Sequence, residues 1–363
     1  MKQTIIKLMK KPLGFLSISL IFLSFVVSIF CFQFATDNTK DANQMNVALA
    51  NKSIGSCIWV IKVPLFIKEK KINYLEEFFF GKQMVSKEIP IKSFQIKDKF
   101  ILFKTKNSNE AIVENRIELK PFLAKGISIS EIKQKYIYKK IFYLGTDKFG
   151  RDYYSRLMIG TRFSFLIGFF SVLISLVIGI FFGALGGYYK GKTDAIIMLI
   201  INIVWSIPSM LLVIAITIIL GKGYWQIFLA VGLTMWVDVA RLVRGQFLSF
   251  REKEFVESAR ALGFSDLRII IKEILPNITS SIIVISSANF ASAILIESGL
   301  SFLGIGIQPP TPSWGNIMRE HYSQIMFGHQ HLAILPGILI MVLVLAFTIF
   351  GNELRDALDV NYR

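Results

Sequence analysis

The sequence predicts an all-α polytopic membrane protein with six transmembrane helices and a small β-containing insert after the first of them. Hydrophobic residues make up 53% of the 363 positions, and they gather into long runs with few charged side chains. An α-helix needs about 20 apolar residues to cross a hydrocarbon core of about 30 Å. Six runs approach that length, at residues 13–34, 163–187, 195–220, 224–240, 277–296 and 332–350.

These runs divide the chain into three parts. Residues 1–34 contain a basic N-terminus and the first span, and residues 35–140 form a long segment before the second span. Residues 141–363 contain the other five spans and a polar hairpin at residues 251–276. We expect the first span to remain as a membrane anchor, because its apolar run is long and lacks the small residues of a signal-peptide cleavage site.

The distribution of basic side chains predicts the orientation of the spans. Lys2, Lys7, Lys10 and Lys11 precede the first span, which places the N-terminus in the cytoplasm by the positive-inside rule. Threading six spans from there puts the loops at 188–194 and 241–276 on the cytoplasmic side, together with the C-terminus. The segment at 35–140 then lies outside.

The outer segment at residues 35–140 is predicted to be a small β-containing domain or a partly ordered insert. Its stretches at 58–67, 93–104 and 111–119 are rich in Ile, Val and Phe, with partial alternation and polar breaks. This pattern is typical of short strands. No catalytic constellation is visible in the segment, and an addition specific to one lineage is the favoured interpretation.

The formal net charge of +16 does not predict binding to nucleic acid. Most of the excess lies in the lysine-rich outer segment, where lysines are scattered among Ile, Phe and Asn. That scatter is typical of a solvated surface. We also expect no catalytic, metal or cofactor-binding site on the chain. Cys31 and Cys57 lack metal-ligand spacing, and no nucleophile, base and metal ligand converge in the sequence.

The polar hairpin at residues 251–276 carries the clearest functional signal. In its first arm, Phe255, Val256, Ala259 and Leu262 fall on one face of a helix. Gly263 follows, where a helix can end with a positive φ. The small side chains of this arm would let another protein approach its backbone closely.

The second arm of the hairpin is predicted to be another short amphipathic helix. Ser265 is placed to cap it, and Pro276 suits the first turn of the span that follows. Its apolar positions are Leu267, Ile270, Ile271 and Ile274. The two arms would then lie at the membrane surface and bend at Gly263.

The hairpin resembles the Glu-Ala-Ala loop (the EAA motif) of ABC importer permeases, in which an acidic-small-small triplet precedes a glycine and a distal Leu-Pro pair. The corresponding residues here are Glu257-Ser258-Ala259, Gly263 and Leu275-Pro276. Ser258 stands where that family usually has alanine, and Glu273 stands where it often has an apolar residue. An ordinary interfacial helix pair between two spans is the alternative interpretation.

Other motifs resemble the dipeptide/oligopeptide (peptide/nickel) permeases of this family, specifically the C-type permease. The resemblance covers about residue 143 to the end of the chain, together with the first span. Its motifs are the stretch 144–152 with Ser155-Arg156-Leu157 and Gly160-Thr161-Arg162, then Gly186-Gly187-Tyr188-Tyr189, the run from Glu297 to Gly304, the proline-rich stretch 308–315 and the tail 351–359. The first of these is expected to form a turn and a helix at the outer interface, before the second span.

The resemblance implies a type I ABC importer permease fold and a multi-pass protein of the bacterial cytoplasmic (inner) membrane. The implied function is ATP-driven import of di- or oligopeptides, with no enzyme activity and no cofactor on this chain. The implied partners are the lipid bilayer, a second permease subunit, two ATP-binding subunits that hold ATP and Mg, and an extracytoplasmic solute-binding protein. The implied ATPase-coupling residues are Phe255, Glu257, Ser258, Ala259, Gly263, Leu275 and Pro276. A membrane scaffold or sensor with a ligand-binding outer insert is the alternative function.

One motif is misleading. Residues 186–193 satisfy the phosphate-loop pattern G-x-x-x-x-G-K-[ST]. That loop binds phosphate only between a β-strand and a helix, whereas here it joins two predicted spans. We interpret it as a tight basic turn.

Single residues in the spans and loops carry weaker predictions. Gly179 and Gly183 would let a neighbouring helix approach closely, and Pro208 can kink its span. Asp238 lies at the inner end of the fourth span, where pairing or contact with the interface is expected. The three histidines of the outer loop are expected to be solvated: His321, His329 and His331.

Overall fold

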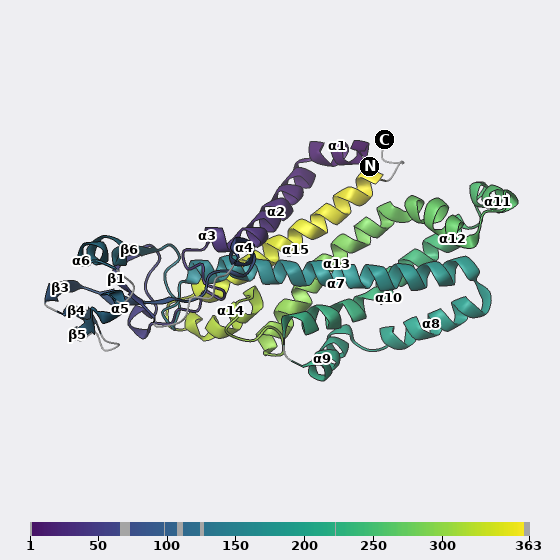
Figure 1. The fold of residues 1–363 in the computed structure, drawn as a ribbon. Helices are drawn as coiled ribbons and strands as arrows, with labels where there is room; N and C mark the ends of the chain where they lie inside the picture. The colour runs from purple at the N-terminus through teal and green to yellow at the C-terminus, as the bar shows by residue number, and fades with distance from the viewer. Residues whose placement is uncertain are drawn as a thin grey trace.

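The computed structural model describes residues 2–65, 73–97, 99–106, 112–123, 127–221 and 223–358. The chain forms an elongated helical bundle with the insert at one end and the hairpin at the other (Figure 1). Among the residues that the structure describes, five helical elements are long and apolar enough to cross a membrane. They are α2 Pro12–Ile29, α7 Tyr153–Tyr189, α10 Tyr224–Phe250, α13 Leu275–Leu303 and α15 His331–Leu358. This mostly helical architecture confirms the predicted fold class.

The predicted span at 195–220 is not one continuous helix. It is a pair, α8 Gly191–Trp205 and α9 Ser209–Leu220, bent by 88°. Pro208 stands in the break, where it has no amide hydrogen to continue the ladder of α8. The kink expected at this proline is therefore a right-angled interruption, and the pair counts as a sixth span only if both halves are taken together.

The second span begins earlier than predicted. Residues 153–162, expected to form a separate interfacial helix, belong to α7, which runs without interruption for 37 residues. Its glycines bring α10 close, as expected from the sequence. A Cβ added at Gly179 would lie 2.5 Å from the Cβ of Val239, and one at Gly187 would lie 2.5 Å from that of Phe247. The close contact between α7 and α10 therefore depends on glycines, because a side chain at these positions would clash with α10.

The centre of the bundle is an aromatic cluster from three helices. The rings of Phe290 in α13 and Phe347 in α15 stack with centroids 3.9 Å apart. The ring of Phe165 in α7 lies 5.1 Å from that of Phe290. All three side chains are buried, so their ring contacts join α7, α13 and α15.

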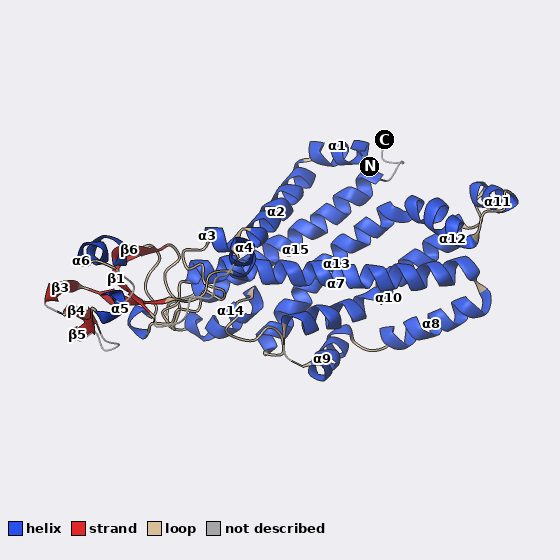
Figure 2. Cartoon of the chain, viewed as in Figure 1, coloured by secondary structure: helices blue, strands red, loops and turns tan. Residues whose placement is uncertain are grey.

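The insert contains strands, and Figure 2 shows them only at its end of the molecule. They form two antiparallel three-stranded sheets, in the orders β2-β1-β6 and β3-β4-β5. The strands are β1 Ser56–Pro64, β2 Ser86–Ile91, β3 Ser93–Lys97, β4 Phe100–Lys106, β5 Ile112–Glu118 and β6 Ile137–Phe142. The predicted strand at 93–104 is thus a hairpin of two, and β6 continues past residue 140. Parts of the stretches predicted at 58–67 and 111–119 lie outside the described residues.

Short helices complete the chain. At the insert end these are α3 Cys31–Phe34, α4 Tyr74–Phe80, α5 Lys120–Leu123, α6 Ile129–Glu131 and α14 Trp314–His321; at the other end they are α1 Lys2–Lys10, α11 Glu254–Ala261 and α12 Asp266–Arg268. Two 3₁₀ turns, Val47–Leu49 and Tyr322–Ile325, and two π-helical segments, Ile132–Tyr136 and Ile269–Ile274, link them. The chain ends lie together at the hairpin's end of the bundle (Figure 1).

Candidate functional site

The first arm of the hairpin, α11, ends at the glycine that the sequence indicated. Gly263 has a φ of +76°, and its amide donates to the carbonyl of Arg260 at 2.9 Å. The amide of Phe264 donates to the carbonyl of Ala259 at 3.1 Å. These two bonds form a Schellman motif, in which a left-handed residue satisfies the last carbonyls of a helix. The bend between the two arms is therefore fixed by backbone geometry.

The two faces of α11 have different surroundings. Val256 and Ala259 are buried in a cluster that also contains Ile269, Ile274 and Ile278. Phe255 and Leu262, which the sequence pattern placed on the same stripe, are exposed instead. Consecutive positions of an α-helix lie about 100° apart, so Phe255 does not share the direction of the buried Val256, and Leu262 follows the last residue of α11.

This arrangement corrects the expected role of Ala259. The residue was predicted to keep the helix slim for another protein, but only 4% of it is exposed, and it packs against its own chain. Glu257 and Ser258 do face solvent, and the Ser258 hydroxyl donates to the carbonyl of Glu254 at 2.9 Å. Of the small-residue positions in the triplet, only Ser258 is open to a partner.

The second arm is not a separate short helix. It runs from Asp266 through the π-helical segment Ile269–Ile274 into α13, so that residues 266–303 form one long helical element. Ser265 occupies the N-cap position, but its side chain makes no capping hydrogen bond. Leu275 and Pro276 stand in the first turn of α13, directly after the π segment that can accommodate the missing proline amide.

The hairpin exposes four large apolar side chains. The exposed fractions are 39% for Phe255, 73% for Leu262, 67% for Leu267 and 50% for Ile271. We call these four residues the apolar face of the hairpin. Such a group on an otherwise polar loop marks a surface that another molecule covers. The sequence pattern placed all four on the apolar stripes of two amphipathic helices, together with Val256, Ala259 and Ile274, which the structure buries.

The turn between α7 and α8 braces the hairpin. The Tyr188 hydroxyl donates to the Asp266 carboxylate at 2.7 Å, and the Arg251 guanidinium donates to the Tyr188 carbonyl. Lys190 pairs with Glu252 at 2.6 Å. This turn contains the phosphate-loop pattern, but it connects two helices directly, with Lys190 at a φ of +57°. The arrangement is that of a tight basic turn, as expected from the sequence.

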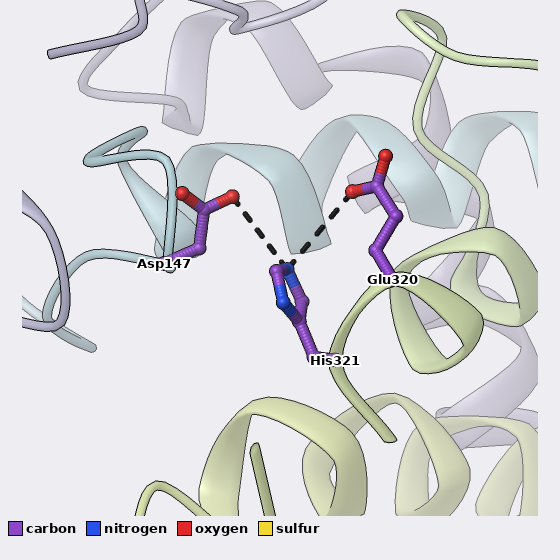
Figure 3. Close-up of side chains that lie close together, drawn as sticks. All are labelled: Asp147, Glu320 and His321. Carbon is purple, nitrogen blue, oxygen red and sulfur yellow. Dashed lines mark ion pairs between the residues drawn. The ribbon is translucent and has the colours of Figure 1, made fainter. Parts of the chain in front are cut away.

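A second group of charged residues lies at the opposite end of the bundle (Figure 3). His321 Nε2 is 3.5 Å from Asp147 Oδ2 and 4.0 Å from Glu320 Oε2. Arg151 donates to the same two carboxylate oxygens, at 2.6 Å each. Arg156 also donates to Glu320, at 3.2 Å. His321 is fully buried, so the expectation that it is solvated is wrong.

Electrostatic balance indicates that this cluster is structural. Asp147, Glu320 and His321 could together contact a metal ion, but two guanidinium groups already compensate the two carboxylates. A divalent cation would leave uncompensated positive charge in a buried site. Burial would raise the pKa of Asp147, but the adjacent His321 side chain and the charge of Arg151 outweigh it and hold that pKa at about 2.

The buried cluster also fixes the start of the insert. Arg151 donates to the Asn43 side chain at 3.2 Å, and the amide of Asp37 donates to the Ser155 hydroxyl at 2.9 Å. The Lys52 amide donates to Thr146 at 2.9 Å. The first part of the insert, the loop before α7 and helix α14 therefore form one hydrogen-bonded unit.

Comparison with known proteins identifies relatives of the helical part of the chain. Residues 162–361 match the family described as "Binding-protein-dependent transport system inner membrane component". The glutathione transport system permease protein GsiD of Pectobacterium atrosepticum is 43% identical over 217 residues, which are 60% of this chain and 72% of the relative. GsiD of Escherichia coli is 41% identical over 217 residues, or 60% of this chain and 71% of the relative.

One solved structure is also similar. A chain from inward-facing conformations of the MetNI methionine ABC transporter aligns with 56% of this chain and 96% of its own length. Its sequence identity is 20% and its TM-score is 0.47.

Proposed function

The chain belongs to the family of binding-protein-dependent transport system inner membrane components, and from that premise we propose that its hairpin couples peptide import to partner ATPases. The chain is a non-enzymatic permease subunit of a peptide-type ABC importer, a multi-pass protein of the inner membrane. ATP is used by partner subunits in such importers. The family match gives no support to the alternative of a scaffold or sensor.

The transported material is a di- or oligopeptide. This assignment is supported by the relatives, which are named as glutathione permeases, and glutathione is itself a small peptide. The partners are a second permease, two ATP-binding subunits and an extracytoplasmic solute-binding protein.

The orientation places the hairpin and both chain ends in the cytoplasm and the insert outside. The basic residues support it, because α1, which contains Lys7 and Lys10, lies at the hairpin's end of the bundle (Figure 1). Lys11 Nζ is 2.8 Å from Glu353 Oε2 near the C-terminus, so both chain ends share that side.

The apolar face of the hairpin is the observation that carries the coupling proposal. Phe255, Leu262, Leu267 and Ile271 would enter a groove of the ATPase, while Val256 and Ala259 hold the hairpin to its own chain. Glu257 and Ser258 would lie at the rim. Closure of the ATPases would press on the hairpin, and the force would pass directly into α13 because residues 266–303 are one helical element. The permease would then shift between inward-open and outward-open states, each favoured by a different ligand.

Leu262→Glu tests this proposal. A carboxylate at the most exposed position of the apolar face would have to be desolvated in the ATPase groove, so we expect co-purification of the ATPases to fall at least tenfold. Leu75→Glu is the matched control, because Leu75 is 63% exposed but lies on α4 at the other end. Equal co-purification of both variants and the wild type would contradict the proposal.

A further inference from the structure

The break between α8 and α9 opens a cavity on the side of the bundle. The cavity has a volume of about 230 Å³, and its wall includes Trp205, Pro208, Ser209, Thr234 and Asp238. Trp205 ends α8, Pro208 stands in the break, Ser209 begins α9, and Thr234 and Asp238 come from the middle of α10. Ser209, Thr234 and Asp238 give polar groups to a wall that is otherwise formed largely by apolar side chains such as Val204, Ile207, Leu212 and Val237.

Asp238 brings a carboxylate to this cavity, and the positive charge of Arg241 lies near enough to act on it. Within the described residues its carboxylate makes no hydrogen bond and no ion pair, and the residue is exposed. Arg241, one turn further along α10, has other partners. It donates to the Asn202 side chain at 2.9 Å, and its guanidinium lies 4.1 Å from the centre of the Trp205 ring.

The backbone at the break adds further acceptors. The carbonyls of Trp205, Ser206 and Ile207 accept no hydrogen bond from any described residue, because Pro208 interrupts the ladder that would use them. The C-terminal end of the 15-residue helix α8 also carries partial negative charge. The cavity therefore combines a carboxylate, free carbonyls and a negative helix end.

This surface cannot face lipid. Unsatisfied backbone groups and an ionised carboxylate at membrane depth are tolerated only where protein buries them or water reaches them. For a permease that encloses a pathway with a second subunit, the remaining possibilities are the pathway itself or the contact with that subunit. Interrupted membrane helices whose carbonyls and C-terminal ends face a cavity are a recurrent way to hold a cation in transporters.

The chemistry of the cavity suits an ammonium group better than a metal ion. Ca²⁺ takes about 6–8 oxygen ligands and Mg²⁺ demands near-octahedral coordination, whereas the cavity offers one carboxylate and the free carbonyls of the break. A primary ammonium carries three N–H donors, which match one carboxylate and two carbonyls. The α-amino group of a peptide is of this type and is largely protonated at neutral pH, since its pKa is about 8.

We propose that the cavity at the break between α8 and α9 is a subsite for the α-ammonium group of a peptide in transit, with Asp238 as its anchor. The inference rests on the proposed function of peptide import. It assigns to this chain a residue that distinguishes peptides with a free N-terminus from peptides in which that terminus is blocked.

The test is a competition between trialanine and N-acetyl-trialanine for uptake into proteoliposomes that contain the complete importer and its binding protein. The ratio of the two uptake rates is measured for the wild type, Asp238→Asn and Asp238→Glu. Selection by the binding protein is the same in all three and cancels when the ratios are compared. Loss of one charge-assisted hydrogen-bonded pair predicts that Asp238→Asn lowers the trialanine preference by about tenfold, and that Asp238→Glu restores most of it.

Three results would overturn the inference, and the third would also overturn the proposed function. An unchanged ratio in Asp238→Asn would show that the carboxylate does not meet the ammonium group. Equal loss of uptake for both peptides, with less second permease co-purifying, would show that Asp238 pairs with that subunit instead. A wild-type importer that takes up neither peptide would overturn the proposed function, and the inference with it.

Discussion

The two ends of the bundle hold their functional surfaces by different physical means. At the insert end, buried ion pairs among Asp147, Arg151 and Glu320 join two segments that are far apart in sequence, the loop before α7 and helix α14. At the hairpin end, α11 is held by the apolar cluster around Val256 and Ala259 and by Gly263, which has a positive φ. The ion pair of Lys190 with Glu252 at this end is exposed to solvent. The buried ion pairs hold the insert end in one arrangement, whereas the hairpin end leaves apolar side chains exposed for a partner.

The comparison also indicates which end of the molecule contributes mainly to stability and which mainly to coupling. Buried charges tolerate little change, because each partner removed leaves another uncompensated. The hairpin contributes less to the fold, so changes in it should affect coupling before they affect stability. The three predictions below test this separation, in order of decreasing effect.

Arg151→Met should cause the largest loss of stability. It would leave the buried carboxylates of Asp147 and Glu320 without their main cation, at a cost of about 3–5 kcal/mol. Lys190→Met removes the cation of the exposed pair and should leave the melting temperature unchanged, because solvent screens that pair. Thermal unfolding of both variants in detergent measures the difference. Similar melting temperatures for the two variants would show that the ends do not differ in this way.

Acid should weaken the insert end through Asp147. Its folded pKa of about 2 lies below the ordinary value of 3.8, so ionised Asp147 stabilises the fold at every pH above about 4. That contribution, roughly 2 kcal/mol, should disappear as pH falls from about 4 toward 2. The melting temperature of the wild type should therefore exceed that of Asp147→Asn at pH 7 and at pH 5, and the gap should close near pH 2. A gap that stays constant across this range would contradict the ion network.

Gly263→Val should disturb coupling more than stability. A Cβ at Gly263 meets nothing within 4 Å, so the cost comes from the positive φ alone, about 1–2 kcal/mol for a non-glycine residue. Gly245→Val is the matched control, because its Cβ would also meet nothing within 4 Å and its φ is helical. We expect substrate-stimulated ATP hydrolysis to fall severalfold in Gly263→Val and to persist in Gly245→Val. Equal activities would mean that the bend at Gly263 does not transmit force.

Much of this architecture could be predicted from the sequence, because long apolar runs and a helix-ending glycine act locally. The spans, the bend at Gly263 and the close approach of α7 and α10 follow from such local signals. The burial of His321 could not be predicted, because its partners Asp147 and Arg151 come from a loop far away in the sequence. The burial of Ala259 could not be predicted either, because it depends on packing against Ile269 and Ile274 of the second arm.

The break at Pro208 shows the same limit in another form. A proline predicts that a helix can bend, but the size of the bend depends on what the two halves pack against. Here α9 leaves the line of α8 by 88°, and only the three-dimensional arrangement places Asp238 of α10 at the opening. From the sequence alone, Asp238 was predicted to lie at the inner end of a span.

Site-specific photo-crosslinking tests the coupling proposal most directly. A photoreactive side chain is placed at position 262 or 267 of the hairpin, or at position 75 of the insert, in the complete importer. If the apolar face of the hairpin docks into an ATPase, positions 262 and 267 will crosslink to the ATP-binding subunit and position 75 will not. Crosslinks from 262 and 267 to lipid alone, in an importer that still contains its ATPases, would contradict the account.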